Sequence, residues 1–278
     1  MRSAFSTGIS SVPPVVKNII IINVLMLLGT YFLQNIYDFT SHFALYYPAS
    51  DYFKPHQFIT HMFMHGGLTH LFFNMFALWM FGRVLESIWG SKRFLFYYFF
   101  TGIGAAALHT FVNYLEISPM QHAYQLYISN PSPDAFIKFI DEYSGFFHDY
   151  YPGFEIKIQN FITSWQQDPS NINFLNETDD FIHQAIEARM NIPTVGASGA
   201  VFGVLLAFGM LFPNTELMLL FPPVPIKAKW FVLGYGAIEL YLGLTQPGSN
   251  IAHFAHLGGM LFGFILIKYW NKSKKTFY

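Results

Sequence analysis

The most restrictive feature of this sequence is a series of six apolar stretches, each near the roughly 20 residues that a helix needs to cross a bilayer. They cover about 16–34, 68–88, 94–114, 196–213, 228–245 and 251–270. Charged residues make up only 11% of the chain, whereas a soluble domain has about 25%. Because the bilayer core offers no water, each stretch must satisfy its own backbone hydrogen bonds. The sequence therefore predicts an all-α polytopic membrane protein, built as a bundle of six transmembrane helices.

The predicted division of the chain follows these stretches. It consists of an N-terminal cytoplasmic arm (1–15), helices one to three with a first outer loop (16–114), an insert (115–194), helices four to six (195–270) and a cytoplasmic tail (271–278). The chain has no cysteine, which excludes disulfides, thiolate metal sites and cysteine catalysis. Its formal net charge is −1, so nothing indicates nucleic acid as a partner. No metal or other cofactor is expected.

The insert at 115–194 differs in composition from the rest of the chain. It carries three bases and 11 acids, which gives a net charge of 3 − 11 = −8. Asp134 could cap a helix over about 134–148, and Asn176 with Asp179 or Asp180 could open another over about 177–190. We expect an extra-cytoplasmic helical insert. It either covers the mouth of a site or is a solvated spacer.

The basic residues predict an orientation in the membrane. With a cytoplasmic N-terminus and six spans, the inner segments hold 11 of the 15 bases. These are Arg2, Lys17, Arg83, Lys92, Arg93, Lys227, Lys229, Lys268, Lys272, Lys274 and Lys275. An excess of bases on the inner side is the general rule for membrane proteins. Both termini are then cytoplasmic, and the insert lies outside.

A serine within a run of small residues opens the fourth stretch. Gly196-Ala197-Ser198-Gly199 leads into an apolar segment, so Ser198 is predicted in the first turn of a helix, near the outer face. Unpaired backbone N–H groups and the positive end of the helix dipole lie there, where they favour developing negative charge. Ser198 is thus a candidate nucleophile. The alternative is a small-residue interface between membrane helices.

The sixth stretch supplies a candidate base. His256 lies shortly before the pair Gly259 and Gly263, and Ser198 lies just before the pair Gly199 and Gly203. Glycines at this four-residue spacing let helices pack closely. Packing the fourth helix on the sixth through these faces would bring Ser198 against His256, as a nucleophile and its base require. Phe202 lies one turn beyond Ser198, where its ring could pack on the imidazole.

The second stretch carries two further polar side chains. His70 and Asn74 are four residues apart and share one helical face. With the Ser198 N–H group they could form an oxyanion hole, since an amide is a neutral donor that can be buried. Alternatively, both side chains bond neighbouring helices.

Taken together, these motifs resemble the rhomboid intramembrane serine proteases, in particular the bacterial type. The resemblance covers about 56–114 and 194–268. It implies a multi-pass protein of the bacterial inner membrane, a Ser198–His256 dyad without an acidic third member, and an oxyanion hole at His70, Asn74 and the Ser198 N–H. The implied partners are the lipid bilayer and the transmembrane segments of other proteins, which the enzyme would hydrolyse. A substrate helix is expected to enter near the second and fifth helices.

The same resemblance assigns structural roles and exposes departures. His65 and Glu86 match family positions that are expected to be structural. The family often has Trp-Arg in the first loop, where this chain has His56-Gln57, and this difference puts the packing of the loop in question. The family often has tyrosine where this chain has Phe202.

The sequence also leaves two other functions open. The spacings His61/His65 and His253/His256 would suit a di-histidine haem or metal protein. A non-catalytic rhomboid-like binding protein is the other alternative.

Glu239 is expected near the outer end of the fifth helix, reaching water, with a gating role as a weaker alternative. The segment Gly248-Ser249-Asn250 is expected to be a flexible cap over the site.

Overall fold

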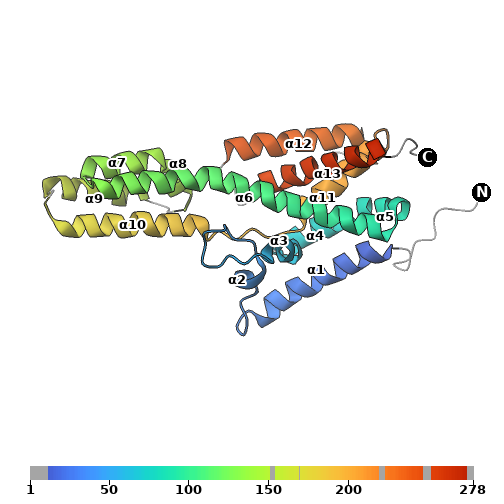
Figure 1. Ribbon diagram of the computed structural model, residues 1–278, viewed down its shortest axis with the longest axis horizontal. Coiled ribbons are helices and arrows are strands. Elements are labelled where there is room, and N and C mark those ends of the chain that lie inside the picture. Colours follow the sequence, from blue (N-terminus) through green and yellow to red (C-terminus); the bar gives the residue numbers. More distant parts are fainter. Residues whose placement is uncertain (1–11, 151–153, 169, 219–222, 247–251, 274–278) are drawn as a thin grey trace, which may run out of the picture.

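The fold is described from a computed structural model, which describes residues 12–150, 154–168, 170–218, 223–246 and 252–273. Helices dominate this part of the chain (Figure 1), which confirms the predicted class. One antiparallel hairpin, β1 (Glu216–Met218) with β2 (Pro225–Lys227), connects two of the helices.

The described chain has a helix at each of the six positions where a membrane helix was predicted. They are α1 (Pro14–Leu33), the continuous rod of α4 (Leu68–Ala77), a π-helical turn (Leu78–Gly82) and α5 (Arg83–Trp89), then α6 (Ser91–Ser129), α11 (Ser198–Leu211), α12 (Ala228–Thr245) and α13 (His253–Ser273). The first three of these are long and apolar enough to cross a membrane by length and composition, and α11 is a shorter apolar helix. The chain is therefore a multi-pass integral membrane protein.

The centre of the bundle is α11, the helix that begins at Ser198. It packs against α13, α6 and α12, and most of its side chains are buried. A helix that is apolar on all sides is typical of such a central position. The site at its first turn is consequently enclosed by other helices.

Glycines allow this close packing. A Cβ atom at Gly259 would overlap the carbonyl group of Gly199, so α13 lies directly on the α11 backbone. One turn further, the Tyr97 hydroxyl donates to the Gly203 carbonyl at 2.8 Å. The predicted contact between the fourth and sixth helices is confirmed. The Cβ directions of Gly199 and Gly203, however, point to Ala105 and Thr101 of α6, so the glycines join three helices rather than two.

Glu86 is a buried structural residue at the other end of the bundle, as the sequence predicts. Its two carboxylate oxygens accept hydrogen bonds from the N–H groups of Val15 and Val16 at 3.0 and 2.8 Å. The Ser91 hydroxyl donates to the same carboxylate at 2.7 Å. Glu86 thus caps the N-terminus of α1, where unpaired N–H groups favour a negative charge.

The first outer loop contains two short helices and a 3₁₀ turn: α2 (Phe39–Phe43), α3 (Gln57–Thr60) and His61–Phe63. Gln57 is fully buried. Its side-chain oxygen accepts from the N–H groups of Lys54 and Tyr46 at 3.1 and 3.4 Å, and its nitrogen donates to the Tyr52 carbonyl at 2.8 Å. Gln57, one of the two residues that depart from the family pattern, therefore organises the loop.

The third membrane helix is longer than predicted. It was expected over 94–114, but α6 runs without interruption from Ser91 to Ser129 and contains Pro119. The polarity change near residue 115 marks the point where the helix leaves the bundle, rather than its end. A helix can continue through such a change when another set of helices covers its apolar face.

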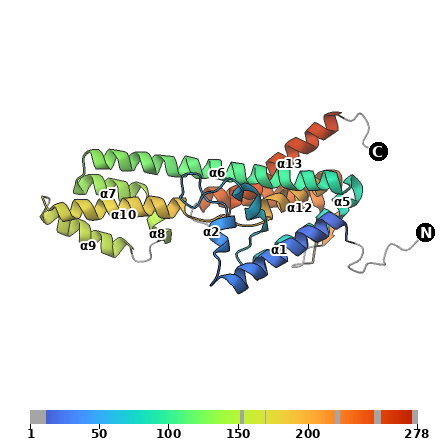
Figure 2. The same cartoon turned by 60° about the horizontal axis from the view of Figure 1, so that its bottom comes forward.

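Those helices form the insert, which projects from the bundle in both orientations (Figures 1 and 2). They are α7 (Pro133–Glu142), α8 (Ser144–Tyr150), α9 (Phe154–Gln167) and α10 (Ile172–Met190). Their core contains Phe136, Trp165 and Ile182, packed with Met120 and Tyr127 of α6. The insert is thus a helical unit with its own hydrophobic core.

Both predicted helix starts in the insert were wrong. Ser132 caps α7 by accepting from the Ala135 N–H at 3.1 Å, and Asp134 lies inside the first turn. Asn171, not Asn176, caps α10 and accepts from the Asn173 N–H at 3.1 Å. In each case a polar residue a few positions earlier supplies an equally suitable acceptor, so the helix starts sooner.

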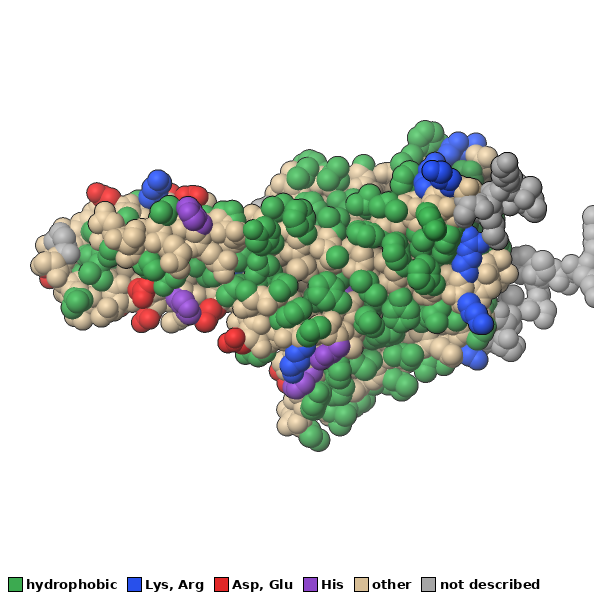
Figure 3. All heavy atoms as spheres, viewed as in Figure 1, with side chains coloured by type: hydrophobic (Ala, Val, Ile, Leu, Met, Phe, Trp, Pro, Cys, Tyr) green, Lys and Arg blue, Asp and Glu red, His purple; other side chains and the backbone are tan. Residues whose placement is uncertain are grey.

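The surface shows how charge is distributed along the molecule. Most Lys and Arg side chains visible in Figure 3 gather at the end of the bundle away from the insert. Asp and Glu side chains in the same view lie mainly on the insert, and the bundle between these ends is largely apolar. The helix α1 begins, and α13 ends, at the basic end of the bundle.

Candidate active site

Ser198 is the first residue of α11, as the sequence predicts. The chain reaches it through Gly196, whose φ of +129° lies in a region that side chains other than glycine rarely adopt. The Gly196 N–H donates to the His61 carbonyl at 2.9 Å. A Cβ atom on Gly196 would approach the His70 ring to 2.9 Å. Glycine at this position therefore sets the direction of the chain and leaves room for His70.

His256 lies in the first turn of α13 and meets Ser198. Its Nε2 atom is 2.9 Å from the Ser198 Oγ atom, within hydrogen-bond distance. For Nε2 to accept the hydroxyl proton, the neutral ring must carry its own proton on Nδ1. The contact predicted from the two glycine pairs is present, with the geometry of a nucleophile and its base.

Phe202 contacts the face of the same imidazole. The two ring centroids are 4.2 Å apart and the ring planes differ by only 5°. On its other side, Phe202 packs against Tyr235 of α12, with centroids 4.8 Å apart. The predicted stacking is confirmed, and it restricts tilting of the His256 ring away from Ser198.

His70 and Asn74 lie beside this pair, on α4. The His70 Nδ1 atom accepts from the Gly66 N–H at 3.4 Å, which leaves Nε2, packed against Gly196, as the protonated nitrogen. Asn74 is buried, and its side-chain nitrogen donates to the His70 carbonyl at 3.0 Å. The His70 ring thus lies next to Gly196, close to Ser198, while one amide N–H of Asn74 is used within its own helix.

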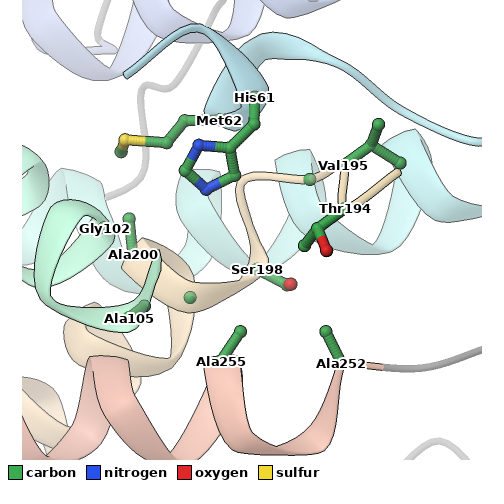
Figure 4. A pocket seen from close by; sticks show the side chains of 12 residues that line it. His61, Met62, Gly102, Ala105, Thr194, Val195, Ser198, Ala200, Ala252 and Ala255 are labelled. Atoms are coloured by element: carbon green, nitrogen blue, oxygen red, sulfur yellow. The ribbon is translucent and has the colours of Figure 1, made fainter. Parts of the chain in front are cut away.

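A small cavity opens at the serine. Figure 4 shows the Ser198 hydroxyl between Ala255 of α13, with Ala252 just before that helix, and the loop that carries Thr194. His61 faces the same space from the first outer loop. The cavity gives the hydroxyl a side that protein atoms do not fill. The proposed cap at Gly248-Ser249-Asn250 lies outside the described residues.

Two loop histidines near the site are held neutral. Burial lowers the pKa of His61 to about 4. Burial, and secondly the neighbouring His70, lower the pKa of His65 to about 4. The His65 ring packs edge-on against His70, with centroids 5.0 Å apart, consistent with the predicted structural role of His65.

We expect acid to destabilise the fold through these two histidines. Their folded-state pKa values lie below the ordinary value of about 6.5, so the unfolded chain binds more protons as the pH falls from about 6.5 to 4. Each histidine can then cost up to about 1.4 kcal/mol of folding free energy per pH unit. Thermal unfolding in detergent micelles at pH 7 and pH 5 measures this loss. Replacement of both His61 and His65 by glutamine should reduce the difference, and an unchanged difference would contradict the assignment.

Glu239 was expected to reach water, but it does not. It is only 4% exposed, and its Oε2 atom lies 2.6 Å from Nδ1 of His253. The same oxygen is 2.9 Å from Nδ1 of His256, the nitrogen that faces away from Ser198. The expectation failed because Glu239 faces α13 rather than the outer end of the bundle. A buried ionisable residue in a membrane helix is itself a signal of function, and this signal was available in the sequence.

The same three residues provide the atoms of a possible metal site. Glu239 offers a carboxylate oxygen, and His253 and His256 each offer a ring nitrogen. These three atoms lie within 4.8 Å of one another. Two ligands on a tetrahedral zinc ion, each at about 2.0–2.1 Å, would be about 3.3 Å apart. The carboxylate–imidazole distances of 2.6 and 2.9 Å are shorter, and they match hydrogen bonds or ion pairs instead.

The other histidine pair does not form a helical ligand set. His61 lies in the 3₁₀ turn that ends at Phe63, and Met64 is extended, so His61 and His65 do not share a helical face. The His61 Nδ1 atom also contacts the Gln57 carbonyl at 2.8 Å. The spacing from which a di-histidine site was inferred thus loses its structural basis.

Comparison with known proteins gives the family. A family model of the rhomboid domain matches residues 52–119 and 178–272, which together form more than half of the chain. Rhomboid protein 1, mitochondrial, from Saccharomyces cerevisiae is 36% identical over 88 residues, covering 31% of this chain. That match spans a quarter (25%) of the length of the yeast protein. Because the family model covers more than half of the chain, the chain belongs to the rhomboid family.

Proposed function

We propose that this protein is an intramembrane serine endopeptidase that cleaves transmembrane segments of other membrane proteins with a Ser198–His256 pair. The observation that carries the proposal is the 2.9 Å contact between Ser198 Oγ and His256 Nε2. It occurs at the first turns of two helices that touch at Gly199 and Gly259. Such a contact fixes the nucleophile and base within a buried bundle, where a serine hydroxyl can be activated.

The chemistry follows from this placement. His256 removes the Ser198 proton while Oγ attacks the scissile carbonyl carbon, and an acyl-enzyme forms when His256 protonates the leaving amine. Water then repeats the two steps and releases the second product. The N–H group of Ser198, with the side chains of His70 and Asn74, holds the negative oxygen of each tetrahedral intermediate.

The substrate class follows from where the site lies. The helices around Ser198 expose large apolar side chains, including Phe72 and Phe73 of α4 and Trp230 and Leu233 of α12. These surfaces suit a lipid-embedded partner, and a substrate helix enters between α4 and α12. Its backbone must unwind locally, because helical hydrogen bonding shields the carbonyl group that Ser198 attacks.

The orientation follows from the distribution of charge. We propose that the basic end of the bundle faces the cytoplasm and that the acidic insert lies on the outer side. The proposal for a bacterium is an inner-membrane protein with both termini inside. Water reaches Ser198 from the outer side.

The test is cleavage in a reconstituted bilayer. The probe is a fluorescent single-span protein with glycine and other helix-destabilising residues in the outer half of its span. The unmutated protein should cleave it, and Ser198→Ala should not, while retaining its thermal unfolding midpoint. Equal cleavage by both would refute the proposal. Binding without cleavage by the unmutated protein would instead favour a non-catalytic rhomboid-like role.

Asn74→Ala is expected to slow cleavage about 100-fold. Removal of one oxyanion donor typically costs a factor of about 10²–10³ in kcat. Because the Asn74 amide also bonds the His70 carbonyl, we expect a small loss of thermal stability beside the kinetic defect. Measurement of kcat and the unfolding midpoint of the same preparation separates the two effects. A normal kcat would remove Asn74 from the oxyanion hole.

A further inference from the structure

A buried carboxylate lies directly behind the candidate base. Glu239, on α12, and His253 and His256, on α13, are all nearly inaccessible to solvent. One oxygen of Glu239 approaches Nδ1 of both histidines, at 2.6 Å for His253 and 2.9 Å for His256. The order of groups across the bundle is therefore Ser198, His256, then Glu239.

A charge in this position requires a reason. Burial of an ionised carboxylate in a membrane helix is costly unless partners compensate for the lost hydration. His253 is one such partner, with a hydrogen bond to Glu239. The second approach, to His256, concerns the ring whose opposite nitrogen contacts Ser198.

The surroundings of the His256 Nδ1 atom also point to a role for Glu239. It is buried and lies at ion-pair distance from Glu239, but outside the angular range of a hydrogen bond, and no other described group accepts from it. Phe202 stacks on the ring face and limits tilting of the ring. Catalytic hydrogen bonds are often misaligned without substrate and tighten in the complex. A small adjustment of the side-chain torsion angles of Glu239 would place the carboxylate in line with this N–H group.

We propose that Glu239 is a positioning residue that holds His256 in the tautomer needed to deprotonate Ser198. This inference deepens the proposed function and rests on it. The bundle then has an acidic third member, whereas the family resemblance implies a dyad alone.

The proton balance of this arrangement is simple. In the resting site, Nδ1 of His256 carries the proton and Glu239 is ionised. During attack, the Ser198 proton moves to Nε2, and the imidazolium that forms lies beside the carboxylate. No proton needs to reach Glu239, which acts by orientation and by its charge. His253 holds the carboxylate in place from the other side.

Glu239 supplies the negative charge near His256. The titratable or hydroxyl groups around His256 are Ser198 of α11, His70 of α4, His109 of α6, Tyr235 and Glu239 of α12, and His253 of α13. Among these described residues, Glu239 is the one carboxylate. Its removal should therefore make His256 harder to protonate.

The test measures how the rate at which a fluorophosphonate labels Ser198 depends on pH. A fluorophosphonate reacts with an activated serine, so its labelling rate follows the fraction of His256 that is unprotonated. For Glu239→Gln we expect the maximal rate and kcat to fall about 100-fold. The midpoint of the pH profile should move to lower pH, while KM stays unchanged because Glu239 does not line the cavity at Ser198. Glu239→Asp should restore the midpoint and part of the rate.

A matched control distinguishes positioning from structure. Glu86 is also buried, but it caps α1. Glu86→Gln should lower the thermal unfolding midpoint and leave the pH midpoint of labelling unchanged. If Glu239→Gln kept the pH profile and the rate of the unmutated protein, the inference would be overturned. It would also be overturned if unfolding explained all of the rate loss in both Glu239→Gln and Glu239→Asp. If the unmutated protein neither labels nor cleaves, the proposed function itself fails.

Discussion

His256→Ala is expected to reduce cleavage about 10⁴-fold or more, with the membrane bundle intact. Loss of the base leaves the Ser198 proton without an acceptor at 2.9 Å. In other serine hydrolases, removal of the nucleophile or the base costs factors of up to about 10⁶ in kcat. The measurement is kcat for a single-span substrate in liposomes, alongside the thermal unfolding midpoint.

The control for this variant is another histidine. His122 is exposed on the part of α6 that belongs to the insert. His122→Ala should therefore cleave at the unmutated rate. If His256→Ala retained more than a tenth of the unmutated kcat, another group would have to act as the base.

Gly259→Leu is expected to disrupt both the fold and the reaction. A Cβ atom at this position would overlap the Gly199 carbonyl, which is backbone and cannot rotate away. Overpacking typically costs about 1–3 kcal/mol, and we expect the upper end here. Separation of α13 from α11 by about 1 Å would also move His256 from Ser198, which can reduce the rate about 100-fold.

A glycine facing open space supplies the comparison. Gly234 of α12 has no atom within 4 Å of the position that a Cβ would occupy. Gly234→Leu should leave the thermal unfolding midpoint close to its unmutated value. Equal losses in the two variants would show that glycine is needed for a reason other than the contact of α13 with α11.

The sequence predicted the bundle well because hydrophobic length and small-residue spacing are local properties. The limits of α12 and the start of α11 followed from apolar runs bounded by polar or helix-breaking residues. The contact of α11 with α13 followed from Gly199 and Gly259, since close backbone approach requires glycine on both sides. These predictions needed no knowledge of the rest of the chain.

The insert was harder to predict. The helix α9 was missed, and α6 was ended too early, because their apolar residues are mixed with polar ones and gain stability from packing against each other. Helix starts at Ser132 and Asn171 depended on which of several nearby polar residues accepts the first N–H groups. Sequence alone does not rank such neighbouring acceptors.

The role of Glu239 shows why the site was only partly predictable. Ser198 and His256 are placed by glycine pairs that the sequence displays. The approach of Glu239 to His253 and His256 depends on how far α12 is rotated about its axis, and no local pattern specifies that rotation. The same holds for Asn74, whose amide bonds its own helix.

The central claim is that Ser198 is a nucleophile activated by His256. Mass spectrometry of the purified protein, after reaction with a fluorophosphonate in a bilayer, tests it most directly. We predict a single phosphonyl adduct on Ser198, absent in Ser198→Ala and formed at least 100-fold more slowly in His256→Ala. A folded protein that gives no adduct on Ser198, or that labels equally fast without His256, would contradict the account.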